Sequence, residues 1–100
     1  MLFRDVINLI GEVPGAHGVF DAVTETSRQE YCTVRTVGMS EAYAAMSYGL
    51  HPELVFLLSE YTDYQGEKIA EYAGKRYRIV RTYRANQGIE LTCEEVTVDK

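Results

Sequence analysis

The sequence predicts an all-β (mainly β) domain, a small β-barrel or sandwich of about six strands with one short helix or long loop between strands 2 and 3. Two observations carry this prediction. Short runs of β-branched and aromatic residues recur along the 100 residues, and turn signals rich in Gly, Asn and Asp separate them. Strands at this spacing favour a sandwich or a barrel. The length corresponds to one domain, residues 1–100.

The beginning of the chain contains two predicted strands and a loop. Residues 2–10 alternate in polarity, so their odd positions from Phe3 onward, apart from Asp5, are expected in the core. Residues 11–18 contain three glycines and one proline and should form a flexible loop. Residues 20–37 are rich in β-formers and are expected as one long strand or a bent pair of strands.

Residues 40–50 change character and form the one predicted helix. Ser40 followed by Glu41 is typical of an N-cap with an acid in the first turn. Gly49 stands where a C-cap glycine would end the helix. Because so short a helix is marginal in water on its own, it must either pack on the sheet or be mobile.

Strand signals are denser in the second half. Residues 53–61 contain a continuous apolar run, which indicates burial on both faces. Residues 67–72 and 75–84 form a predicted hairpin around a tight turn at Ala73–Gly74. After a further turn, residues 89–96 form the last predicted strand.

Charge is distributed unevenly along the chain. The formal net charge is −5, which makes the free protein a poor non-specific DNA binder because duplex affinity comes mostly from neutralising phosphates. Six of the ten basic residues nevertheless lie between Lys68 and Arg84. Surfaces of opposite sign favour head-to-tail stacking of like subunits, which generates rings. A solvated basic strand explains the same residues equally well.

No recognisable active-site pattern is present in the sequence. It contains no GxSxG, HExxH or phosphate-binding glycine loop, and His17 and His51 are isolated. Cys32 and Cys93 lack metal-ligand spacing and are expected as small core residues, with a disulfide as the less favoured alternative. Ser40 is expected as a helix cap rather than a nucleophile. We therefore expect no enzyme, no cofactor and no metal.

The first residues do not read as a signal peptide, because Arg4, Asp5 and Asn8 interrupt their apolar stretch. No apolar run is long enough to span a bilayer, so no membrane partner is expected. We expect the protein to be made in, and to stay in, a cytoplasmic compartment until assembly.

Residues 77–84 interleave aromatic side chains with arginines, as strands of oligonucleotide-binding barrels do. On a half-buried strand, however, Tyr77 and Ile79 would face the core while Arg76 and Arg78 face solvent. A small nucleic-acid-binding β-barrel is therefore kept as an alternative function. A small enzyme or regulatory ligand-binding domain is a second alternative.

A longer pattern runs through the chain. Its segments are Ser40-Glu41-x-Tyr43-x-Ala45, Gly49-Leu50-x-Pro52-Glu53-Leu54-Val55-Phe56, Asp63-Tyr64-x-Gly66-Glu67, Tyr72-x-Gly74-x-x-Tyr77-x-Ile79-x-Arg81-Thr82-Tyr83, Ile89-Glu90-Leu91 and, at the start, Phe3-Arg4-Asp5-Val6-Ile7-x-Leu9-Ile10. Over nearly the whole chain this pattern resembles the head–tail joining (head closure) proteins of siphophages. One departure is the first loop, which is polar in such proteins, whereas residues 14–18 read PGAHG here.

The resemblance implies a structural virion protein without catalysis. Such proteins form a homo-oligomeric ring, dodecameric in these phages, beneath the portal and its head adaptor protein. The ring closes the channel after packaging and offers a docking surface to the tail completion (terminator) protein. Genomic DNA passes through it without sequence-specific binding. The implied location is the head–tail connector of the virion, after assembly in the host cytoplasm.

The resemblance also implies a plug, because in related proteins the segment between strands 2 and 3 projects toward the channel. Carried over by position, this segment is Met39–Pro52. Its candidate gate residues are Ser40, Glu41, Tyr43, Ala45, Met46, Tyr48 and Leu50. Glu41 and Glu53 are the only charged residues from 39 to 53, and a channel lined by acids does not grip DNA. A helix that simply covers the sheet is the alternative.

Contacts between subunits are expected in the second half of the chain. In the turn at residues 63–67, Asp63 and Gly66 are expected to satisfy backbone geometry, whereas Tyr64 and Glu67 are expected to be free to contact a neighbour. The full set of candidate interface residues is Tyr64, Glu67, Arg78, Arg81 and Tyr83.

Overall fold

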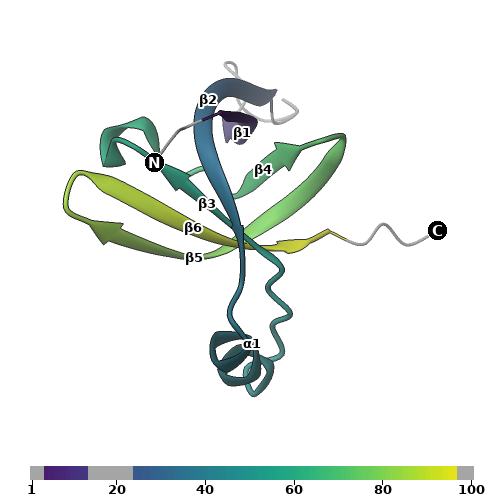
Figure 1. Cartoon of the computed structure of the whole chain (residues 1–100). Helices are drawn as coiled ribbons and strands as arrows, with labels where there is room; N and C mark the ends of the chain where they lie inside the picture. The colour runs from purple at the N-terminus through teal and green to yellow at the C-terminus, as the bar shows by residue number, and fades with distance from the viewer. Residues whose placement is uncertain (1–3, 14–23, 97–100) are drawn as a thin grey trace.

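The structure is a computed structural model that describes residues 4–13 and 24–96. It confirms the all-β class and the barrel: within the described residues, six antiparallel strands close in the order β1-β2-β3-β6-β5-β4 (Figure 1). The strands are β1 (Asp5–Val13), β2 (Thr24–Thr36), β3 (Leu54–Leu58), β4 (Ile69–Tyr72), β5 (Lys75–Ala85) and β6 (Gly88–Glu95). An α-helix, α1 (Met39–Met46), lies between β2 and β3, and a 3₁₀ turn, η1 (Tyr61–Asp63), follows β3.

The first strand continues beyond its expected end. Residues 11–13 were expected in a loop, but they extend β1 and pair with Thr24–Thr26 of β2. Gly11 is needed here for a close approach rather than a turn, since a Cβ at this position would lie 3.0 Å from the Oγ1 of Thr26. Residues 14–18 lie outside the described part of the chain.

The alternation expected in β1 is confirmed at Ile7 and Leu9, but it breaks at Ile10, an even position that is also buried. Ile7 and Leu9 are fully buried, whereas Phe3 lies outside the described residues. Asp5, the polar exception, is half-buried and accepts a hydrogen bond from the Tyr72 hydroxyl at 3.3 Å. This bond gives a carboxylate at the barrel wall a partner and ties β1 to β4.

The core fills the barrel interior and centres on Phe56. Its ring lies 5.4 Å from the ring of Tyr72 and 5.8 Å from that of Tyr77, in tilted and edge-on arrangements. Such aromatic pairs add to the free energy gained from apolar burial. The other members of the buried cluster are Ile7, Leu9, Cys32, Leu58, Ala70, Ile89, Leu91 and Cys93. Cys32 and Cys93 are thus free core residues, as expected, and form no disulfide.

The hairpin of β4 and β5 closes at the expected turn. Ala73 and Gly74 both have positive φ, 53° and 81°, as a two-residue hairpin turn that follows strand twist requires. Tyr77 points into the core and Arg78 to solvent, in agreement with the expected alternation. A β-bulge then shifts the register between Ile79 and Arg81.

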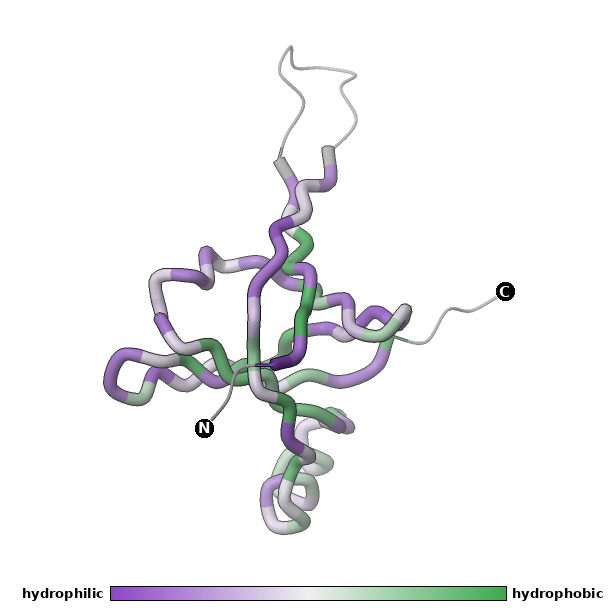
Figure 2. Tube along the Cα trace, turned by 45° about the horizontal axis from the view of Figure 1, so that its top comes forward, coloured by the Kyte–Doolittle hydropathy of each residue, from purple (hydrophilic) through white to green (hydrophobic). Residues whose placement is uncertain are grey.

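The connection between β2 and β3 projects from the barrel as an arm, residues Met39–Pro52, at the end opposite the β1–β2 hairpin (Figures 1 and 2). The expected cap is wrong: α1 begins at Met39, so Ser40 lies inside the helix. Gly38 takes the cap position because its backbone is extended, and its carbonyl accepts the Ala42 N–H at 2.9 Å.

Gly49 ends the helical turn as expected. Its φ is 78°, its N–H donates to the Met46 carbonyl at 3.0 Å, and the Leu50 N–H donates to the Ala45 carbonyl at 3.2 Å. These two bonds are those of a Schellman motif, which glycine favours at the left-handed position. The α-helical part ends at Met46, earlier than expected. Within the described residues, no helix has the length and apolar character to span a bilayer.

Candidate functional site

The outer face of the arm carries an apolar stripe. Met39, Tyr43 and Met46 are spaced i, i+4, i+7 and therefore share one side of α1. They are 72 %, 65 % and 50 % exposed, and no residue of α1 is buried. Tyr48, just after the helix, is 82 % exposed. The helix therefore does not cover the sheet with this face, and exposed apolar patches are where interaction surfaces are sought.

The inner face of the arm borders a groove of about 490 Å³, here named the α1–β5 groove. Its apolar walls are Ala44, Ala45, Leu50 and Pro52 from the arm, with Val80 and Thr92 from β5 and β6. Of the candidate gate residues, the structure brings Ser40, Glu41, Ala45, Tyr48 and Leu50 to this groove. It places Tyr43 and Met46 on the outer stripe instead.

An ion pair joins the helix to the barrel across the groove. The Nη2 of Arg81 lies 2.8 Å from the Oε2 of Glu41. The sequence predicted Glu41 as a gate residue and Arg81 as a subunit-interface residue. The structure brings these two residues into contact with each other. Because the Arg81 side chain is largely exposed, the pair holds the helix only weakly.

The return of the arm to the barrel is attached more firmly. The His51 N–H donates to Glu94 Oε1 at 2.9 Å, and Glu94 also pairs with Arg78. Pro52 is buried, and the Glu53 N–H donates to the Cys93 carbonyl at 2.8 Å. The hydrogen bond from the His51 N–H lowers the pKa of Glu94. Burial raises this pKa and Arg78 lowers it, and the net shift is downward.

Most of the charge of the basic strand β5 is paired within the chain. Arg76 donates to both carboxylate oxygens of Glu25, at 3.0 and 3.2 Å, and Arg84 stacks on the Tyr61 ring with 3.4 Å to its centroid. Arg78 and Arg81 have the partners already described. Three of the four arginines of β5 are therefore paired with acids distant in sequence, although their side chains remain largely exposed, as on a solvated basic strand.

The expectation that Tyr64 and Glu67 are free is wrong. The Tyr64 hydroxyl donates to the Glu67 carbonyl at 2.6 Å. The Glu67 carboxylate accepts Arg28 Nη2 at 2.7 Å, and Arg28 also donates to the Asp63 carbonyl. Arg28 lies on β2, so this link fastens the 63–67 turn to the barrel. Tyr83, by contrast, is 59 % exposed.

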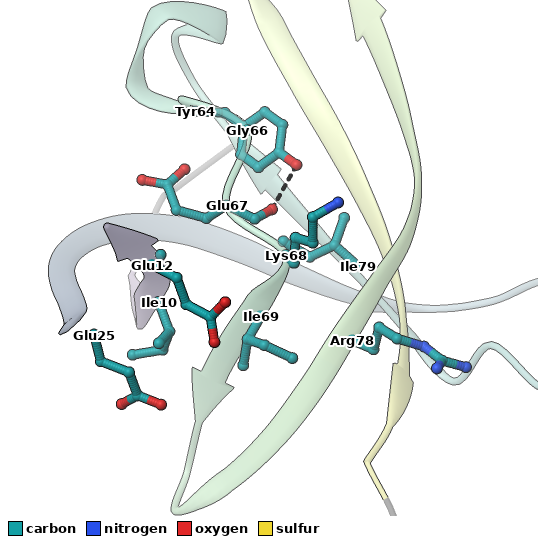
Figure 3. Close-up of a pocket in the computed structure, with 11 residues that line it drawn as sticks. Ile10, Glu12, Glu25, Tyr64, Gly66, Glu67, Lys68, Ile69, Arg78 and Ile79 are labelled. Carbon is teal, nitrogen blue, oxygen red and sulfur yellow. Dashed lines mark hydrogen bonds between the residues drawn. The ribbon is translucent and has the colours of Figure 1, made fainter. Parts of the chain in front are cut away.

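Figure 3 shows a second cleft, of about 660 Å³, between the β1–β2 hairpin and the segment that leads into β4. Glu12 and Glu25, which are cross-strand neighbours on β1 and β2, line it together with Glu67. Arg76 lowers the pKa of Glu25. Burial raises the pKa of Glu67, but hydrogen bonds from Arg28 and the Gln65 N–H bring it below its ordinary value. Held ionised, neither suits the role of a general acid.

In the part of the chain that the structure describes, no group of three His, Cys, Asp or Glu side chains could hold a metal ion.

The sequence did not point to three residues that the structure places at these contacts: Arg28, Glu94 and Val80. Glu94 gives one signal, since it points away from the core face of Leu91 and Cys93. The Glu94 side chain is covered by residues 50–53, and the sequence does not predict that these residues pack against β6.

Comparison with known proteins adds no relative. No protein-family model matches the sequence, and no curated protein matches it. The resemblance to head closure proteins therefore rests on the residue pattern given above.

Proposed function

We propose that the protein is a structural subunit of the ring that seals the DNA-filled head of a tailed bacteriophage, below portal and adaptor, and that offers the tail its attachment surface. The observation that carries this proposal is the arm, which lies between β2 and β3 at the position of the plug implied by the resemblance. A closed barrel with one exposed, lightly held segment suits a gate, because the segment can move while the fold stays intact.

The charges of the arm support passage of DNA. Residues 39–52 contain no Lys or Arg, and their one carboxylate, Glu41, is paired with Arg81. A segment without free cations does not hold phosphates. The partners in this proposal are further copies of the chain, the head adaptor and the tail completion protein. Its location is the virion connector, after assembly in the host cytoplasm.

The alternative of a nucleic-acid-binding barrel has less support. Strand binding through β5 would have to break the pairs that Arg76, Arg78 and Arg81 make with acids of the same chain. Titration with labelled single-stranded DNA at moderate salt distinguishes the two functions. Micromolar binding that Arg78→Ala and Arg81→Ala abolish would favour the alternative; we expect no such binding.

Deletion of the gene in the phage tests the proposed role directly. Heads should fill with DNA and then leak it, and tails should accumulate separately. The readouts are electron microscopy of lysates and nuclease sensitivity of the packaged DNA. Normal virions from the deletion would contradict the proposal.

Deletion of the arm tests the gate within that role. Replacing residues 39–50 by a short Gly-Ser linker keeps the Val37 N–H bond to the Glu53 carbonyl at the base. The strand signal in circular dichroism should remain, and heads should lose DNA. The matched control replaces the Ala73–Gly74 turn by Asn-Gly, which suits the same turn and should leave DNA retention unchanged. Loss of the β-fold on arm deletion would make the helix part of the core instead.

A further inference from the structure

We infer that neighbouring copies of this chain contact each other through α1, with the outer stripe of one copy lying in the α1–β5 groove of the next. This inference deepens the proposed ring and rests on it for its biological setting. The contact itself requires only the isolated chain.

The two faces of α1 point in opposite directions. With about 100° between successive residues, Met39, Tyr43 and Met46 fall within about 60° of one another. The groove-facing residues Glu41, Ala44 and Ala45 are centred about 180° away. The stripe therefore cannot fill the groove of its own copy, whereas the stripe of a second copy can.

A contact between two different faces of the same chain is heterologous. It repeats from copy to copy and closes into a ring when the rotation permits. A symmetric dimer through the stripe alone would leave both grooves open. A foreign helix in the groove would leave the stripe exposed. A second copy in head-to-tail order covers both surfaces, which is why we commit to it.

The chemistry of the two surfaces matches. Stripe side chains are Met and Tyr, which adapt to irregular apolar sites. The groove walls include Ala44, Leu50 and Val80, and its charged rim is the closed pair of Glu41 with Arg81. Docking therefore buries no unpaired charge, which would be costly.

The area fits a ring better than a stable pair. At the exposures given above, the three stripe residues present about 400 Å² of mostly apolar surface. A specific interface needs about 800 Å² on each partner. One contact presents about half of that, so an isolated pair should be weak, whereas in a closed ring each copy is held by two such contacts. The free chain should thus be a monomer when dilute and associate near millimolar concentration.

Disulfide trapping with purified full-length chains tests the contact. Tyr43→Cys marks the stripe and Ala44→Cys marks the groove, and both sites are exposed. The two variants are mixed at about 1 mM, where a contact with a millimolar Kd is half occupied. Mild oxidation should join position 43 of one chain to position 44 of the other, in excess of either homodimer. Mass spectrometry identifies the linked peptides.

Two controls define the background. Lys75→Cys, exposed at the β4–β5 hairpin, replaces Ala44→Cys in a parallel mixture and should give about tenfold less cross-linking with Tyr43→Cys. Adding Met39→Ser and Met46→Ser to the Tyr43→Cys chain should lower the yield by about tenfold, because apolar burial is lost. Cys32 and Cys93 stay silent because both are buried.

The outcomes separate cleanly. A yield equal to the Lys75→Cys control, or a dominant link between two copies of position 43, overturns the head-to-tail contact. A positive cross-link together with normal virions from the gene deletion keeps the contact and removes the phage role. No cross-link together with leaking heads keeps the phage role and removes the contact.

Discussion

The carboxylate of Glu94 accepts the backbone N–H of His51 at 2.9 Å, which fastens the returning end of the arm to the outer face of β6. Glu94 is buried and also pairs with Arg78, so one carboxylate serves the arm and the barrel wall together. The arm is thus held at its base, while its helix is tied to the barrel by an exposed ion pair. The first two predictions follow from this arrangement.

Glu94→Ala should loosen the base of the arm. The substitution removes the acceptor of the His51 N–H, and because His51 is exposed and can bind water instead, the loss should be about 0.5–1.5 kcal/mol of unfolding free energy. Urea denaturation measures that loss, and hydrogen exchange should become faster at the amides of Leu50, His51 and Glu53. The control is Glu95→Ala, whose side chain is exposed and makes only a 3.7 Å pair with Lys75. Equal destabilisation by both variants would contradict the assigned role.

Acid should release the same attachment. The folded-state pKa of Glu94 is lowered from its ordinary 4.5, so the unfolded chain binds the proton more readily. Its stabilising contribution is complete above pH 4.5 and is lost as the pH falls through the lower folded value. The protection factors of the amides of Leu50, His51 and Glu53, after correction for the pH dependence of intrinsic exchange, should therefore fall below pH 4.5 in the native chain. Glu94→Gln should flatten that dependence, and a dependence that survives it would assign the effect to other carboxylates.

The pair of Glu41 with Arg81 should contribute little stability but control the helix. A double-mutant cycle with Glu41→Gln and Arg81→Gln should give a coupling energy of about 0.2–1 kcal/mol that decreases with added salt. Protection of amides 42–46 from exchange should fall in each single variant and no further in the double variant. Independent, additive effects would mean that the two side chains do not act on each other.

The barrel core should depend strongly on Phe56. Phe56→Ala removes a fully buried ring from between Tyr72 and Tyr77, and such truncations cost about 3–5 kcal/mol. Thermal or urea unfolding followed by circular dichroism measures the change. Tyr83→Ala, at an exposed aromatic, should stay within about 0.5 kcal/mol of the native chain. A small loss for Phe56→Ala would place the core elsewhere.

Both thiols should be unreactive in the folded protein. Burial raises the pKa of Cys32 and of Cys93 to about 12, and the thiol is shielded as well as protonated. Ellman's reagent at pH 8 should detect no thiol in native protein and both in denaturant, since neither forms a disulfide. Rapid reaction of the native protein would show that the barrel opens around Cys32 or Cys93.

Local chemistry accounts for what the sequence predicts well. The turn at Ala73–Gly74, the helix end at Gly49 and the alternation around Tyr77 depend on neighbouring residues, and all agree with the structure. The prediction of an N-cap at Ser40 failed because Gly38, two residues earlier, has the extended backbone of an N-cap, so the helix begins before the serine. The prediction of a loop beginning at Gly11 failed because a glycine that allows close approach looks the same in sequence as one that turns the chain.

Contacts distant in sequence account for what was missed. Three of the four arginines of β5 read as free charges in the sequence, yet Glu25, Glu41 and Glu94 pair with them from β2, α1 and β6. Alternation places Arg76 and Arg78 on the solvent side but does not say which acids share that side. The division of α1 into a stripe and a groove face likewise depends on where Val80 lies, which the β-bulge sets.

Closure of the barrel also governs when this chain can fold. β1 pairs with β4 and β3 pairs with β6. The pairing of β1 therefore cannot be completed until residues near 70 are made, and that of β3 until β6, the last strand, is made. Such non-local pairing slows folding and favours a single cooperative step late in synthesis. The hydrogen bonds of the arm are mostly between residues close in sequence, so its helix can fold and unfold faster than the barrel. A newly made chain therefore forms its barrel in one step, while its arm can still fold and unfold after the barrel has closed.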